Sequence, residues 1–256
     1  KSKFFENINF NDERLIRSPF LETKLERYFI SLVYPKADSI KKDADLILQK
    51  TEGNQDMYRY VLWYITNIYE TTDMVGLDGV VVHLYENHYL KNADWLDADQ
   101  RKRFEDRLKV IKPLETGKVL PELVLKDTQG KVHNLYDVKS KYTIVYFYSP
   151  DCGHCKDHAP ILVKFFDENK DKGFTVWNIS TENKQDINEV KNFITTYKTE
   201  ELTNLYDPEK RYDFMNNYDV YSTPTLYILD EQKRIIGKRI PIEDINNYLD
   251  FYEKNK

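Results

Sequence analysis

The chain of 256 residues has only two cysteines, which excludes a fold held together by several structural disulfides. It has no glycine-rich phosphate loop, so we expect no nucleotide or flavin cofactor. The net charge is −5 and neither half is basic, so we expect no nucleic-acid partner. No apolar run is long enough to cross a bilayer. Attachment to a membrane would therefore depend on a missing leader or a lipid anchor.

The two cysteines occur in Cys152-Gly153-His154-Cys155, at the junction between a predicted strand and a predicted helix. Residues 142–148 are almost all apolar, β-branched or aromatic, which is typical of a buried parallel strand. Ser149-Pro150-Asp151 ends that strand, and helical spacing of apolar residues follows. A helix N-terminus lowers the pKa of a nearby thiol. His154 can further favour the thiolate of Cys152, whereas the carboxylate of Asp151 should oppose it.

Three chemistries are open to such a cysteine pair. A zinc site would need further ligands, and completing it with His83, His88 or His133 would require separate segments to converge, so we expect no metal. A structural disulfide in so short a ring would remove little entropy from the unfolded chain. The pattern favours thiol–disulfide exchange, in which the Cys152–Cys155 disulfide is itself the redox centre and no other cofactor is needed.

The segment from Tyr146 to Lys156 resembles the active site of thioredoxin-like proteins, most closely the TlpA/ResA-like branch. Supporting matches are Gly117-Lys118-Val119-Leu120-Pro121, Asp127-Thr128-Gln129-Gly130-Lys131 and Thr223-Pro224-Thr225. The resemblance implies a thioredoxin-like fold with Cys152 and Cys155 as the catalytic residues. It also implies that Pro224 follows a cis peptide bond and that Thr223 binds an extended substrate through its backbone.

Two positions depart from the family pattern. Tyr146 lies where thioredoxin has a buried aspartate, so that proton acceptor is absent. His158 lies where TlpA/ResA-like proteins commonly have a glutamate, one helical turn after Cys155. Its imidazole is a candidate for proton transfer to or from the buried thiol, and the alternative is a histidine that only packs or caps.

The sequence predicts two domains of different class. Residues 1–112 show helical spacing throughout and predict a bundle of about five helices, of unknown function, with a capping box at Asp97 and Gln100. Residues 113–256 predict an α/β thioredoxin-like sandwich, in which Pro208 opens a short helix with Tyr212 and Met215 facing inward. The arrangement resembles exported proteins of Bacteroidetes-type bacteria that carry a helical domain before a TlpA-like domain.

The predicted bundle shows no convincing chemistry. His83, Glu86 and His88 form H-x-x-E-x-H, a near match to a metalloprotease helix motif. On an α-helix this spacing puts the second histidine on the wrong face. We therefore interpret these three as helix-surface residues.

The function expected is an exported oxidoreductase that reduces or exchanges disulfides of envelope proteins. Its partners would be protein thiols and disulfides and an upstream electron-donor thiol protein, in the periplasm or cell envelope of a Gram-negative bacterium. The Gly153-His154 pair also resembles protein disulfide isomerase, so an oxidase or isomerase stays open. A binding or scaffold protein led by the helical domain is a further alternative. A peroxidase is less favoured, because the threonine and proline that peroxiredoxins place before their reactive cysteine are missing around Cys152.

Overall fold

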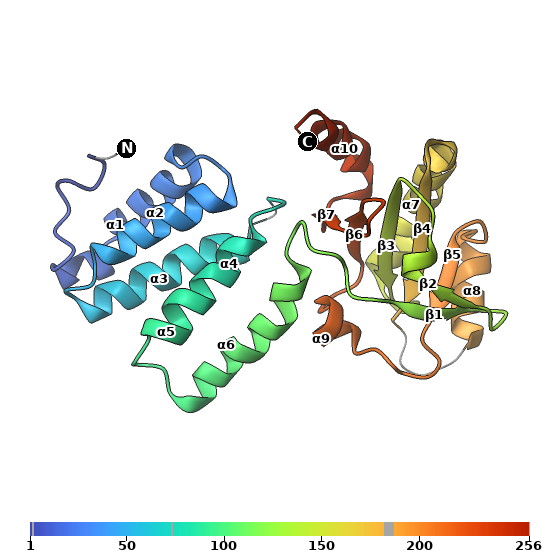
Figure 1. The fold of residues 1–256 in the computed structure, drawn as a ribbon, viewed down its shortest axis with the longest axis horizontal. Coiled ribbons are helices and arrows are strands. Elements are labelled where there is room, and N and C mark those ends of the chain that lie inside the picture. The colour runs from blue at the N-terminus through green and yellow to red at the C-terminus, as the bar shows by residue number, and fades with distance from the viewer. Residues whose placement is uncertain (2, 73, 182–186, 256) are drawn as a thin grey trace. The chain divides into compact units, whose positions relative to one another are not determined.

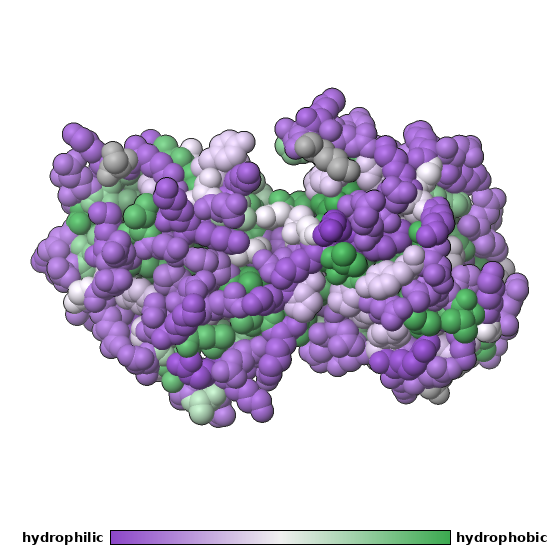
Figure 2. Space-filling view, viewed as in Figure 1, coloured by the Kyte–Doolittle hydropathy of each residue, from purple (hydrophilic) through white to green (hydrophobic). Residues whose placement is uncertain are grey.

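The computed structural model describes residues 1, 3–72, 74–181 and 187–255, and the chain divides into two compact units, Lys1–Lys112 and Pro113–Lys256 (Figure 1). That the two units fold independently, as separate domains would, stays a prediction. Among the described helices, none combines the length and apolar character needed to cross a membrane. The face seen in Figure 2 is mostly hydrophilic, with scattered apolar residues.

The first unit is helical, as the sequence predicts. Two of its elements are π-helical turns, in which the hydrogen bonds run from residue i to i+5. The helical elements are η1 (Glu13–Arg17), α1 (Pro19–Arg27), π-helical η2 (Tyr28–Leu32), α2 (Ala37–Gln49), α3 (Gln55–Glu70), α4 (Asp78–Leu84), π-helical η3 (Tyr85–Tyr89), α5 (Leu90–Asn92) and α6 (Ala98–Ile111). The 3-10 turn η4 (Lys112–Leu114) spans the boundary with the second unit.

Apolar side chains at helical spacing build the core of this unit. On α3 the side chains of Met57, Val61 and Ile65 lie on one face and are fully buried. Burying a side chain of this size contributes roughly 1.5–3 kcal/mol, so the shared core holds the helices together. The predicted capping box is confirmed, since Asp97 accepts from the Gln100 N–H at 2.7 Å and the Gln100 side chain accepts from the Asp97 N–H at 3.1 Å.

The second unit is a mixed sheet with the strand order β2-β1-β5-β4-β3-β6-β7. The three strands β3, β4 and β5 are parallel, and their neighbours β1 and β6 are antiparallel to them. The edge strands β2 and β7 pair antiparallel with β1 and β6. The strands are β1 (Val124–Asp127), β2 (Val132–Asn134), β3 (Tyr142–Tyr148), β4 (Phe174–Ser180), β5 (Thr203–Tyr206), β6 (Thr225–Leu229) and β7 (Ile235–Lys238). The helical elements are η5 (Leu135–Asp137), α7 (Gly153–Asn169), η6 (Lys170–Lys172), α8 (Ile187–Tyr197), α9 (Phe214–Tyr218), η7 (Ile242–Asp244) and α10 (Ile245–Lys254).

Strand β3 is buried along its whole length, as its composition predicts. Val145 and Phe147 point into the core that contains Tyr218 of α9. Successive side chains of a strand alternate between the faces of the sheet, so Tyr146 and Tyr148 point to the other face. Tyr148 stacks there on Phe193 of α8, with ring centroids 4.3 Å apart. Helices thus cover both faces of the sheet.

Two predictions for the second unit were incomplete or wrong. The sequence pattern did not indicate β5, a four-residue strand that pairs with β4 on one side and β1 on the other. The short helix begins at Phe214 and not at Pro208, because the side chain of Asp213 caps it by accepting from the Asn216 N–H at 3.1 Å. Met215 is 46% exposed, and so does not face inward.

Candidate functional site: a dithiol at the start of helix α7

The two cysteines lie where the central strand β3 leads into helix α7. Both are free thiols. Cys152 is the N-cap residue of α7, and its sulfur accepts from the Cys155 backbone N–H at 3.3 Å. The first turn of a helix leaves such N–H groups without intrahelical partners, so a negative charge on this sulfur is stabilised.

Cys152 is the accessible member of the pair, and its thiol is acidified. Burial favours the neutral thiol, but hydrogen bonds from the side chains of Cys155 and Thr223 and from the backbone N–H groups of Cys155 and His154 outweigh it and lower the pKa. In the thiol form, the sulfur can also donate to the carbonyl oxygen of Thr223, 3.1 Å away. Cys152 therefore has the properties of an attacking thiolate.

Cys155 has the opposite properties. It is fully buried on the inner face of α7. Burial, with the thiol of Cys152 beside it, raises the pKa of Cys155 well above that of an ordinary cysteine. The pair thus offers one sulfur that ionises readily and one that holds its proton.

Thr223 and Pro224 lie across from the dithiol, at the start of β6. The peptide bond between them is cis. Both residues are half-buried, and the 3.1 Å contact between the Thr223 carbonyl oxygen and Cys152 Sγ brings this loop to the reactive sulfur. The structure therefore brings together four of the residues selected from the sequence, although 71 positions separate Cys152 from Thr223.

The three proposed tuning residues lie around the first turns of α7. His154 and Asp151 are exposed, and His158 is half-buried. No described hydrogen bond joins the imidazole of His154 or His158 to either sulfur, and the contact of His154 with Cys152 is through the backbone N–H. The tuning roles of all three side chains stay predictions.

Tyr146 is a site residue whose role the sequence did not predict. Its side chain is 2% exposed and its hydroxyl has no hydrogen-bond partner among the described residues. Burial raises the pKa of Tyr146, and repulsion from Cys155 and Cys152 raises it further. The phenol therefore stays protonated beside the dithiol, and it can donate a hydrogen bond. The sequence did carry a signal for this role, because Tyr146 lies at a position of β3 that faces the same side of the sheet as α7.

Known proteins share both the site segment and the fold. The AhpC/TSA family matches residues 116–238. The thiol-disulfide oxidoreductase ResA of Bacillus thuringiensis subsp. konkukian is 28% identical over 141 residues, which make up 55% of this chain and 78% of ResA. A domain of a possible thiol-disulfide isomerase from Cytophaga hutchinsonii is 40% identical with a TM-score of 0.51, covering 56% of this chain and 96% of that domain.

A second solved structure extends the likeness to the helical unit. The thioredoxin-like protein from Bacteroides caccae superposes with a TM-score of 0.76 and covers 97% of this chain and 90% of its own, at 18% identity. At that identity the likeness concerns the fold. The predicted fold class and family resemblance are confirmed, because the chain belongs to the AhpC/TSA family of thioredoxin-like proteins and is an enzyme of its thiol–disulfide oxidoreductase type.

Proposed function

We propose that the protein reduces or exchanges disulfides of other proteins, with Cys152 as the nucleophile and Cys155 as the resolving thiol. The observation that carries the proposal is the asymmetry of the pair. Cys152 has a lowered pKa and lies at the surface, whereas Cys155 is buried with a raised pKa. An exchange enzyme needs an attacking sulfur that is ionised and a second sulfur that waits until the first has reacted.

The reaction is a two-electron exchange. The thiolate of Cys152 attacks one sulfur of the substrate disulfide, the substrate S–S bond breaks, and a mixed disulfide forms while the leaving thiolate takes up a proton. Cys155 then loses its proton and attacks Cys152 Sγ, which releases the reduced substrate and leaves the Cys152–Cys155 disulfide. A donor thiol protein reduces that disulfide and completes the cycle. Run in reverse, the same steps oxidise a substrate dithiol.

The side chains around the pair have supporting roles in this proposal. Thr223 and Pro224 would hold an extended substrate beside Cys152, since their loop already contacts its sulfur. His158, one turn after Cys155, or a water molecule would accept the proton that Cys155 gives up. Tyr146 would donate a hydrogen bond to the Cys155 thiolate as it forms, which adds a residue on β3 to the predicted set.

The cellular setting in this proposal is the periplasm or cell envelope, with reduction as the direction. It draws on the similarity to ResA and on the lack of a cysteine outside the pair, since a spare thiol in an oxidising compartment invites wrong disulfides. The opposite direction, oxidation or isomerisation, is the second candidate because of Gly153 and His154 between the cysteines.

Two cysteine variants and the reduction potential of the Cys152–Cys155 pair test the proposal. We expect Cys152→Ala to abolish exchange with a protein disulfide, and Cys155→Ala to accumulate a mixed disulfide through Cys152 that mass spectrometry detects. The reduction potential of the pair, measured by equilibration with glutathione, decides the direction. A value near or below about −250 mV indicates a reductase, and one near or above about −180 mV an oxidase or isomerase. Exchange that persists in Cys152→Ala would rule out the mechanism in either direction.

A further inference from the structure

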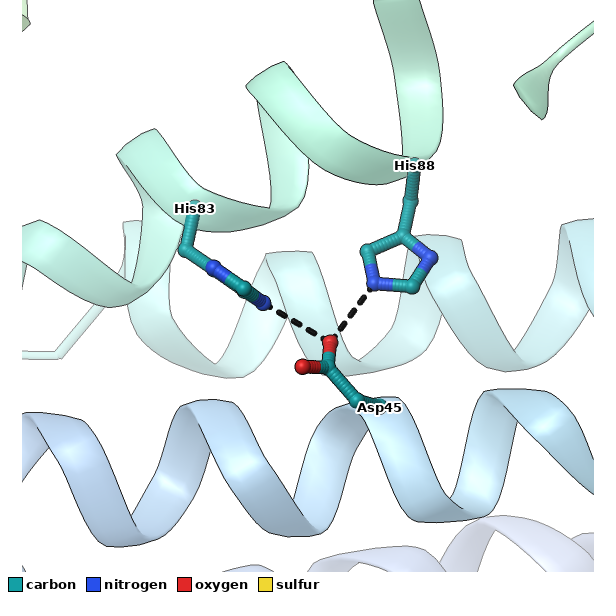
Figure 3. A group of neighbouring side chains, drawn as sticks. All are labelled: Asp45, His83 and His88. Carbon is teal, nitrogen blue, oxygen red and sulfur yellow. Dashed lines mark hydrogen bonds and ion pairs between the residues drawn. The ribbon is translucent and has the colours of Figure 1, made fainter. Parts of the chain in front are cut away.

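A second cluster of reactive side chains lies in the helical unit. The carboxylate oxygen Oδ1 of Asp45, on α2, is 2.7 Å from Nε2 of His83 on α4 and 2.8 Å from Nε2 of His88 on η3 (Figure 3). Potential ligand atoms of the three residues all lie within 4.8 Å of one another. Two imidazole nitrogens therefore converge on one carboxylate, from positions at least 38 residues away along the chain.

A π-helical turn makes this convergence possible. In an α-helix with 3.6 residues per turn, residues five apart lie about 140° from each other around the axis. The π-helical turn η3, from Tyr85 to Tyr89, adds a residue to the turn and brings His88 to the side of His83. The interpretation of these histidines as helix-surface residues was wrong, because His88 is buried and both rings contact Asp45.

The remote nitrogen of each ring also has a partner. The hydroxyl of Tyr58 is 2.7 Å from Nδ1 of His88, and the side-chain amide of Asn87 is 3.1 Å from Nδ1 of His83. In metal sites a hydrogen bond to the second ring nitrogen orients the imidazole, so that the first one faces the ion. A hydroxyl can accept as well as donate, so Tyr58 suits a metal-bound tautomer of His88. The amide nitrogen of Asn87 can only donate to His83, and its oxygen accepts from Lys91, so this amide would have to rotate when His83 binds a metal.

The cluster borders a large cavity. A cavity of about 970 Å³ is lined by Asp45, Tyr58, His88 and Trp95, among others. The side chain of Asp45 is 47% exposed, whereas that of His88 is 11% exposed. An ion held by these residues would keep positions open for water or a small ligand. This resembles the open zinc sites of enzymes, with three protein ligands, more than closed structural sites with four.

We propose that Asp45, His83 and His88 form a binding site for a divalent transition-metal ion such as Zn²⁺. Two imidazole nitrogens and one carboxylate oxygen are ligands that zinc and iron accept, whereas magnesium and calcium prefer oxygen ligands alone. One carboxylate charge also offsets part of the charge of the ion. This site lies in the helical unit and does not depend on the proposed function of the dithiol.

The test is zinc binding to the full chain with the Cys152–Cys155 pair oxidised, because a free dithiol would itself bind zinc. Calorimetric titration should show one Zn²⁺ per chain and no binding of Mg²⁺. We expect His83→Gln and His88→Gln each to weaken zinc binding by more than about 100-fold, and Tyr58→Phe to weaken it roughly 10-fold. X-ray absorption of the zinc-loaded protein should show imidazole nitrogens at about 2.0–2.1 Å.

His133→Gln is the matched control. His133 also contacts a carboxylate, with Nε2 2.9 Å from Oδ2 of Asp127, but that pair has no second histidine. This variant should bind zinc like the unchanged protein. The absorption measurement needs no variant, so a misfolded variant does not weaken the test. The proposal fails if the unchanged protein binds no zinc, if the two His variants bind it normally, or if the bound zinc has no imidazole ligand. After any of these outcomes, the remaining role of the three residues is to join α2 to α4 by hydrogen bonds.

Discussion

At the scale of single residues, the two sulfurs differ in ionisation because they differ in surroundings. The sulfur of Cys152 accepts a hydrogen bond from a backbone N–H at the N-terminus of α7, whereas Cys155 points into the core. We expect the rate at which iodoacetamide modifies Cys152 of the reduced protein to reach half of its maximum at a lower pH than the rate for glutathione. The rate should fall as the pH falls through the lowered pKa, because only the thiolate reacts.

Mass spectrometry at a series of pH values separates the two cysteines. Cys155 is the internal control, and it should react more slowly and only at higher pH. The lowered pKa of Cys152 also contributes stability to the reduced protein above the pKa of an unfolded cysteine, and this contribution is lost as the pH falls through the folded pKa. A midpoint for Cys152 at or above that of glutathione would contradict the assigned nucleophile.

At the scale of single elements, the start of α6 shows how a local signal specifies a helix. Asp97 and Gln100 satisfy each other's backbone N–H groups. We expect Asp97→Ala to lower the free energy of unfolding of the helical unit by about 1 kcal/mol, the usual cost of losing a cap. Urea unfolding followed by circular dichroism measures the change.

Asp94→Ala is the control for that variant, because it removes an exposed carboxylate three residues earlier, outside the helix. It should leave the unfolding free energy nearly unchanged. Equal losses in the two variants would mean that charge, and not the capping box, stabilises this end of α6.

At the scale of the whole molecule, the residues of the dithiol site all belong to one unit. The site, its covering helices and a core of buried side chains lie within Pro113–Lys256. We expect this segment, expressed alone, to fold and to exchange disulfides with a small substrate at the rate of the full chain. Near-ultraviolet circular dichroism and an exchange assay with a small disulfide test this.

The full chain, measured in parallel, is the control. Loss of exchange or of tertiary structure in the isolated segment would show that the helical unit is needed for the fold of the site. If the isolated segment differed from the full chain only in its exchange rate with protein disulfides, the helical unit would have a role in substrate selection.

Features that depend on neighbouring residues follow from the sequence alone. The strand that precedes the cysteines, the helix after them and the cap of α6 follow from composition and spacing within a few residues, since they rest on local hydrogen bonds and one buried face. The two-residue spacing of Cys152 and Cys155 likewise indicates the redox chemistry, because it is a property of four consecutive residues.

Features that depend on residues far apart emerge only when the chain is folded. Strand β5 has little pattern of its own and forms because β1 and β4 flank it. The hydroxyl of Tyr146 lacks a hydrogen-bond partner among the described residues because of the apolar side chains that surround it in the core. Asp45 gains two imidazole partners only because a π-helical turn rotates His88 towards His83, a change of register that ordinary helical spacing does not anticipate.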